Sequence, residues 1–157
     1  MATGTIPKGF HTLSPHIIVK KASEAIEFYK AVFDATESER RIGPDGKLVI
    51  YAVLQVGDSR LMLSEEPPLK PAGGLPVEVS MPVTIHVWTT DVDELLRRAE
   101  SRGAVVTLKP AEQFWGDYYG MFVDPYGHRW SVATRVRTLS SEEIDQAAAK
   151  VFKKLAK

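Results

Sequence analysis

The chain has 157 residues, enough for one ordinary domain or for two small modules that share a core. Its 20 basic and 20 acidic residues cancel, which removes the electrostatic argument for binding nucleic acid or an anionic membrane. It has no cysteine, and this excludes disulfides, thiolate nucleophiles and cysteine-ligated metals. No apolar run approaches the roughly 20 residues that cross a bilayer, and the N-terminal stretch lacks the pattern of a signal peptide, so we expect a cytoplasmic protein.

The first half of the chain, residues 13–64, is predicted to form a β-α-β-β-β module. Residues 14–20 are rich in β-branched side chains and predict a buried strand. Ser23 is the expected N-cap of the helix that follows, where apolar residues recur at helical spacing up to Phe33. Three more strands are expected at residues 36–42, 48–56 and 60–64, separated by turns at Pro44-Asp45-Gly46 and Gly57-Asp58-Ser59.

A second module follows a stretch rich in proline and glycine. Residues 65–80 are predicted to be a linker or exposed loop, because proline removes backbone donors and glycine loosens the chain. The second module is expected over residues 81–135, with Asp91 or Asp93 capping its helix. Its strands are predicted at residues 83–89, 105–108, 119–123 and 128–134, the last two joined by an Asp-Pro-Tyr-Gly turn.

The two halves repeat each other in sequence, which predicts the architecture. The strand and helix that begin at His16 align with those that begin at His86, and Arg60 aligns with Arg129 near the ends of the halves. One sheet and one helix are too little to bury both sheet faces. We therefore predict an α+β fold in which two repeated β-α-β-β-β modules form a curved mixed sheet around a trough, with the helices outside.

An additional helix is predicted over residues 139–156. Ser140 and Glu143 have the spacing of a capping box, and an apolar stripe should dock on the body or on a neighbouring subunit. The stripe consists of Ile144, Ala148, Val151, Phe152 and Leu155.

Over residues 13–135 the chain resembles the vicinal oxygen chelate superfamily, which includes glyoxalase I, bleomycin-resistance proteins, fosfomycin-resistance enzymes and extradiol dioxygenases. The resemblance is carried by the paired modules and by the segments AIEFYKAVFDA, GDSRLMLSEE, TTDVDELLRRAESRGA and WGDYYGMFVDPYGHRWSVAT. It implies a homodimer, because relatives cover their sheet edges by pairing or exchanging modules between chains. It does not define the reaction, since this fold serves isomerases, transferases, dioxygenases and drug-binding proteins.

Enzymes of this superfamily hold a divalent metal with four residues, two from each half. The resemblance places those positions at Ser14, Tyr51, Thr84 and Ser131. None is a histidine or a carboxylate, and neutral hydroxyls are weak ligands on their own, so no metal and no other cofactor is expected.

The histidines leave one alternative open. His16 and His86 lie two residues beyond the first and third of these positions, and a register error of two would make both of them ligands. The same shift applied to the other two positions gives Val53 and Ala133, which bind no metal. Each histidine has an ordinary structural reading as a hydrogen-bonded side chain on a half-buried strand, but their matching positions in the repeat favour a place in the pocket lining.

The remaining candidates are aromatic, and they predict a small-molecule partner. Rings beside two histidines can stack on a planar ligand while offering a few hydrogen bonds. Trp130 is assigned to the core, His128 to a surface turn, and the acids Glu65, Glu66, Asp117 and Asp124 to loops. The predicted ligand-binding residues are His16, Tyr51, His86, Trp88, Trp115, Tyr119 and Ser131.

Three functions follow from these residues, and whether the protein is an enzyme stays open. The first is a metal-free binder of a planar or aromatic small molecule, as a resistance or metabolite-binding protein. The second is a metal-dependent lyase or isomerase of the glyoxalase type, and the third is a metal-free enzyme that uses His16 or His86 as a general base.

Overall fold

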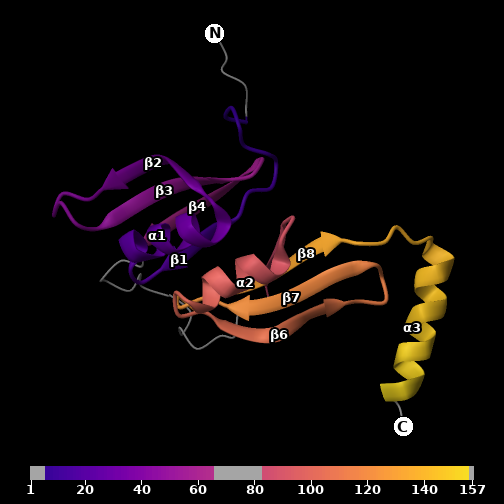
Figure 1. Cartoon of the computed structure of the whole chain (residues 1–157). Helices are drawn as coiled ribbons and strands as arrows, with labels where there is room; N and C mark the ends of the chain where they lie inside the picture. Colours follow the sequence, from indigo (N-terminus) through magenta and orange to yellow (C-terminus); the bar gives the residue numbers. More distant parts are fainter. Residues whose placement is uncertain (1–5, 66–82, 156–157) are drawn as a thin grey trace, which may run out of the picture. The chain divides into compact units, whose positions relative to one another are not determined.

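The computed structural model describes residues 6–65 and 83–155, and Figure 1 follows the chain through them. The chain divides into two compact units, unit 1 from Met1 to Ser80 and unit 2 from Met81 to Lys157. Residue 65 of the predicted linker ends a strand, and residues 66–80 lie outside the described residues.

Unit 1 is a β-α-β-β-β module with one four-stranded sheet. Its strand order is β1-β4-β3-β2, in which β1 runs parallel to β4 and the other neighbours are antiparallel. A parallel pair needs a crossover connection, and α1 with the two following strands supplies it. The elements are β1 (His16–Val19), α1 (Ala22–Phe33), β2 (Thr36–Ile42), β3 (Val49–Val56) and β4 (Ser59–Glu65).

Unit 2 repeats this topology and adds a helix. Its strand order is β5-β8-β7-β6, with β5 parallel to β8. The α+β class and the two four-stranded mixed sheets predicted from the repeat are confirmed. The elements are β5 (Thr84–Trp88), α2 (Val92–Glu100), β6 (Val105–Glu112), β7 (Asp117–Val123), β8 (Arg129–Arg135) and α3 (Ser141–Leu155).

Each sheet packs one face on its own helix. In unit 1, Ile17 and Val19 of β1 are buried, whereas His16 and Ile18, which alternate with them, are exposed. Side chains alternate between the faces of a strand, so this pattern separates a helix-covered face from an open face. The buried side includes Leu54 and Leu63 of the sheet and Ile26, Tyr29 and Val32 of α1. Full burial of each large apolar side chain contributes about 1.5–3 kcal/mol.

The corresponding core of unit 2 lies between α2 and its sheet. Phe122, Trp130 and Val132 are buried there, and the Phe122 and Trp130 rings stack with centroids 6.4 Å apart. Gly120 lets the helix approach, because a Cβ on it would lie 2.8 Å from Leu96 Cδ1. The face of this sheet turned away from α2 is called the open face below.

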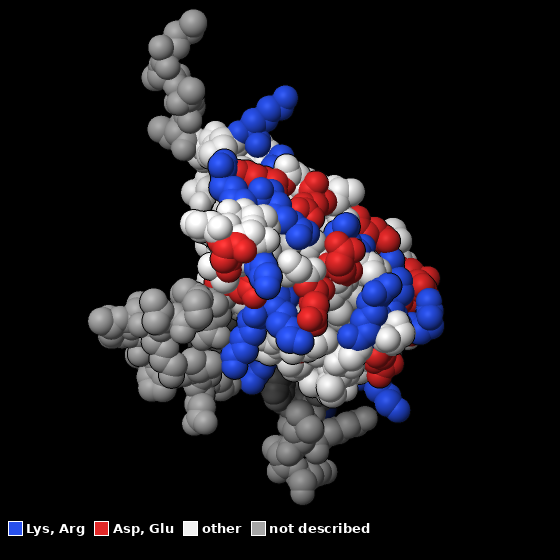
Figure 2. Space-filling model, turned by 90° about the vertical axis from the view of Figure 1, so that its left-hand side faces the viewer, with Lys and Arg blue, Asp and Glu red and all other residues white. Residues whose placement is uncertain are grey.

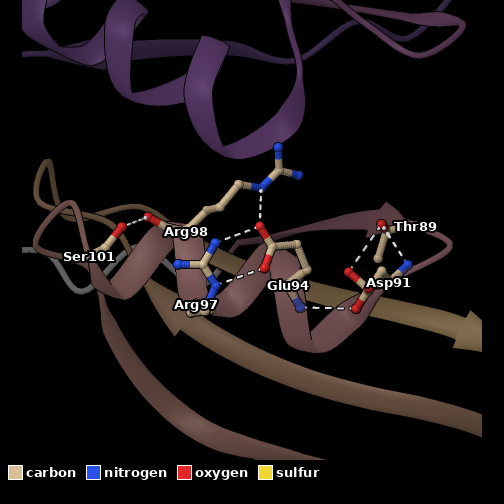
Figure 3. A network of polar contacts seen from close by, with 6 residues as sticks. All are labelled: Thr89, Asp91, Glu94, Arg97, Arg98 and Ser101. Carbon is tan, nitrogen blue, oxygen red and sulfur yellow. Dashed lines mark hydrogen bonds and ion pairs between the residues drawn. The ribbon is translucent and has the colours of Figure 1, made fainter.

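The first helices of the two units differ in their N-caps, and the predicted cap of α1 is wrong. α1 begins at Ala22, one residue before Ser23, so Ser23 lies inside the first turn and Lys21 takes the cap position without a side-chain hydrogen bond. In α2, Asp91 is the cap, and its Oδ1 accepts from the backbone N–H of Glu94 at 3.0 Å. Figure 3 shows this cap with the ion pair between Glu94 and Arg97, whose atoms lie 2.7 Å apart.

The turn between β7 and β8 corrects two further predictions. Asp124 and His128 are buried, at 4% and 6% exposure, although both were expected at the surface. The Asp124 carboxylate accepts backbone N–H groups of Tyr126 and His128, each at 2.9 Å, and the Trp130 indole N–H at 2.8 Å. A carboxylate that accepts three hydrogen bonds is stable away from water. The Asp124 carboxylate therefore holds the turn together and ties it to Trp130.

The capping box of α3 is present. Ser140 N–H donates to the Glu143 carboxylate at 2.8 Å, and Glu143 N–H donates to Ser140 Oγ at 3.2 Å. None of the α3 side chains that the structure describes is buried, so the predicted docking on the body is not seen, and docking on a neighbouring subunit stays a prediction. Among the described residues, no helix is long and apolar enough to cross a membrane.

Candidate functional site

The centre of the candidate site is a histidine–serine pair on the open face of unit 2. His86 on β5 lies opposite Ser131 on β8, and His86 Nδ1 is 2.8 Å from Ser131 Oγ. Ser131 is buried, whereas the His86 ring is partly exposed. Because Nδ1 is engaged with the serine, Nε2 is the nitrogen left for a ligand.

Aromatic rings surround this pair. Trp88 meets His86 edge to face with ring centroids 4.7 Å apart, and the Tyr119 ring lies nearly parallel to His86 at 6.1 Å. Trp115 meets Tyr119 edge to face at 5.7 Å. These four residues, His86, Trp88, Trp115 and Tyr119, are called the ring cluster below.

The strand register explains why the ring cluster forms. Ala133 on β8 pairs with Trp88 on β5 and with Tyr119 on β7, so one small residue separates two ring-bearing strands. Ala133 and Ser131 are both buried. On the open face, β8 therefore carries the small side chains, and the strands on either side of it, β5 and β7, carry the rings.

A tight loop brings Trp115 to the same face. Gly116 has a φ of 97°, a conformation that favours glycine, and its carbonyl accepts from the backbone N–H groups of Val136 and Arg137. Gln113 N–H donates to the carbonyl of Asp117 at 2.8 Å. The loop is therefore closed by backbone bonds, and the Asp117 side chain is engaged with Arg135.

Asp117 forms an ion pair with Arg135 across β7 and β8. Asp117 is 5% exposed, and its carboxylate accepts a hydrogen bond from Arg135 Nε. The two residues lie directly opposite each other in the pairing of β7 with β8. The Arg135 guanidinium carbon lies 5.6 Å from the Trp88 ring centroid. The expectation that Asp117 is a solvated loop residue is wrong, because it begins β7 and is buried.

Partial desolvation favours the neutral form of His86, although the residue is exposed. Desolvation lowers the pKa of His86 below its usual value of 6.5, and the nearby Asp117 carboxylate opposes this only in part. The imidazole is therefore neutral at pH 7 and can act as a hydrogen-bond acceptor or as a base.

Unit 1 carries a smaller version of the same arrangement. His16 Nε2 lies 2.8 Å from Ser64 Oγ, and the Tyr51 ring meets His16 edge to face at 6.2 Å. The Arg60 guanidinium lies over the Phe10 ring at 5.0 Å on this side of the sheet. His16 and Tyr51 are thus together in one unit, and His86, Trp88, Trp115, Tyr119 and Ser131 are together in the other.

The residues at the inherited metal positions do not fit a divalent ion. Ser14 Oγ donates to the carbonyl of His11 at 3.1 Å, and Ser131 Oγ is engaged with His86. Across residues 6–65 and 83–155, no three histidine, aspartate or glutamate side chains gather as a metal site requires. The donor set supports no step through a metal.

Two residues of the site region were not among the predicted ligand-binding residues. Tyr118, grouped in sequence with Trp115 and Tyr119, directs its hydroxyl to Asp93 of α2 at 3.1 Å, and so it belongs to the helix-covered side. Arg135 was missed. Its signal was the alternation of β8, because it follows Ser131 and Ala133 at steps of two and must share their face.

The protein consists of two β-α-β-β-β units with the same strand order. Each sheet has a helix on one face and a histidine on the other. A model of the Glyoxalase/Bleomycin resistance protein/Dioxygenase superfamily matches residues 10–132, and the chain belongs to this superfamily.

The chain is also similar to one curated protein in sequence and to two solved structures in fold. The chain is 44% identical to the Mycobacterium tuberculosis protein Rv0887c over 138 residues, which are 86% of this chain and 81% of that protein. The X-ray structure of the Arabidopsis thaliana At5g48480 product is similar with a TM-score of 0.60 and 25% identity, covering 79% of this chain and 98% of that one. TioX from Micromonospora sp. ML1 shares the fold, with a TM-score of 0.59 at 22% identity over 78% of this chain and 98% of its own.

Proposed function

We propose that the protein binds a planar or aromatic small molecule on the open face of unit 2 and needs no metal ion to do so. The observation that carries this proposal is the ring cluster, in which Trp88 stays 57% exposed although its ring meets that of His86, which in turn lies against Tyr119. An exposed group of large rings with a few polar atoms is typical of a binding surface rather than of an ordinary solvent-facing strand. Resistance to, or storage of, a planar natural product is the physiological role that suits such a binder.

The polar atoms of the site suit a flat ligand. The His86 imidazole offers Nε2 for a hydrogen bond, and the Trp88 and Tyr119 rings lie on the strands at either side of Ala133. Stacking on such rings contributes about 0.5–1.5 kcal/mol each beyond the burial of area. Stacking on two rings alone is too weak for micromolar binding. The burial of apolar surface must add to it, and a planar ligand provides that surface.

Neighbouring tyrosines provide the test. Tyr119 belongs to the ring cluster, whereas Tyr118 bonds to Asp93 on the helix-covered side. In a fluorescence titration with 2-naphthamide, Tyr119→Ala and Trp88→Ala should each weaken binding several-fold, and Tyr118→Ala should leave the dissociation constant unchanged. Equal losses in the Tyr118 and Tyr119 variants would contradict the proposed surface.

One observation favours a second function, a metal-free enzyme with His86 as general base. The pKa of His86 is lowered by burial, so the ring is unprotonated at neutral pH and can accept a proton. His86→Gln would then abolish turnover and retain binding, whereas a pure binder would show no turnover to lose.

A further inference from the structure

We propose that the ligand carries an anionic group, such as a carboxylate, and that Arg135 binds it; this inference rests on the proposed function of the ring cluster. Arg135 lies on the open face at the end of β8, with its guanidinium carbon 5.6 Å from the Trp88 ring centroid. A ligand ring that stacks beside Trp88 would bring a substituent at its edge to this guanidinium.

The contacts of Arg135 leave part of its guanidinium available. Within the described part of the chain, Arg135 donates from Nε to Asp117 and lies against Trp88, and no partner is found for its two terminal nitrogens. Its side chain is 52% exposed. Those nitrogens form the fork that matches the two oxygens of a carboxylate.

Asp117 fixes the orientation of this fork. Its carboxylate is nearly buried, with 7% side-chain exposure, and it sits directly across from Arg135 in the β7–β8 register. An arginine held at Nε and supported by an aromatic ring loses less rotational freedom when it binds an anion. The simpler alternative is that Arg135 serves only to neutralise the buried Asp117 carboxylate.

A matched pair of probes separates these roles. 2-Naphthoate and 2-naphthamide have the same ring system and differ in the charge of one substituent. The wild-type protein should bind the carboxylate about tenfold more tightly than the amide, because hydrogen bonds to charged groups are the stronger ones. The ratio of the two dissociation constants is the readout, since a change in folding stability affects both probes alike.

Arg135→Gln should bring this ratio to about one, and Arg135→Lys should leave an intermediate ratio because it keeps the charge and loses the fork. Arg137→Gln is the control. Arg137 is a half-exposed arginine near the same loop that bonds to the Gln113 carbonyl and pairs with Glu112, and its removal should leave the ratio at the wild-type value.

The outcomes distinguish the inference from the function on which it rests. If Arg135→Gln loses stability but keeps the preference for naphthoate, or if the wild type shows no preference, Arg135 is only a counter-ion for Asp117 and the anion proposal is wrong while ring binding stands. If neither probe binds the wild-type protein, the proposed function fails and this inference fails with it.

Discussion

Trp88 and Trp130 differ in what surrounds each indole. Trp130 is 2% exposed, stacks on Phe122 and donates its N–H to Asp124, whereas Trp88 is 57% exposed on the open face. Removal of a large core ring costs about 3–5 kcal/mol, so Trp130→Ala should lower the free energy of unfolding by that amount. Trp88→Ala should change it by less than about 1 kcal/mol, because an exposed side chain loses little packing. Urea denaturation of both variants measures this, and comparable losses would show that Trp88 is a core residue.

The titration of His86 predicts how stability depends on pH. The folded-state pKa of His86 lies below 6.5, so on acidification the unfolded chain takes up its proton first. Stability should therefore fall as the pH drops from about 6.5 towards the folded pKa, and above that window His86 should have no effect. His86→Gln should lose less melting temperature than the wild type between pH 7.5 and pH 5.5. An unchanged acid-side loss in this variant would assign the effect to other groups.

For single residues, the sequence predicted the sheet face of a side chain better than its burial and hydrogen bonds. Alternation along the strands placed His86 with Trp88 and separated Trp130 from Ser131, and the contacts agree, since Trp130 stacks on Phe122 in the core whereas Ser131 bonds to His86 on the open face. Exposure of Asp117, Asp124 and His128 was mispredicted. The bonds that bury Asp124 come from backbone and indole groups further along the chain, which no local pattern reveals. Whether the predicted lining residues bind a ligand stays a prediction.

Among the elements, the loop that carries Trp115 depends most on a single residue. A Cβ on Gly116 would lie 2.4 Å from the Arg137 carbonyl oxygen, at a φ of 97°. Gly127 has a similar φ of 90°, but a Cβ there meets nothing within 4 Å. Both alanine variants carry the cost of a left-handed conformation, about 1–2 kcal/mol. Gly116→Ala must also displace backbone.

Gly116→Ala should therefore destabilise the protein more than Gly127→Ala does, and it should also weaken 2-naphthamide binding by moving Trp115. Thermal melts and the fluorescence titration on the two variants measure both effects. If the two alanine variants are equal in melting temperature and in affinity, the loop does not position the ring.

Element existence and order were predicted, and the errors lie at the ends. β6 was expected to stop at Leu108 and instead continues to Glu112 through Pro110. The proline is tolerated because it lies in a register irregularity between Leu108 and Ala111, on an edge strand where no ladder donor is needed. A prediction that ends the strand before proline is wrong here, because the irregularity arises from the pairing of β6 with β7 and is not visible in the local sequence.

At the scale of the whole molecule, we propose a homodimer. Each four-stranded sheet ends in two edge strands, β1 and β2 in unit 1 and β5 and β6 in unit 2, and an open edge favours pairing with another chain. Surface charge does not oppose this, because basic and acidic side chains are interspersed on the face in Figure 2. Light scattering at micromolar concentration should give twice the chain mass of 17.4 kDa, and a monomeric mass would refute the dimer.

The repeat predicted the two modules because it is visible along the whole chain. The trough and the exchange of modules between subunits stay predictions that rest on the resemblance. Function was least predictable, since the same paired modules serve binders and several kinds of enzyme, and only particular side chains distinguish them.

The measurement that tests the central claim most directly is binding of an aromatic probe to protein stripped of metal. The protein is treated with a chelator, its metal content is verified, and 2-naphthoate is titrated by calorimetry before and after one equivalent of zinc, nickel or manganese is added. Since none of the residues at the four metal positions is a histidine or a carboxylate, and the Ser14 and Ser131 hydroxyls are bonded to other groups, we expect the same affinity in every titration. Binding that vanishes in the stripped protein and returns with one equivalent of metal would contradict metal-free recognition.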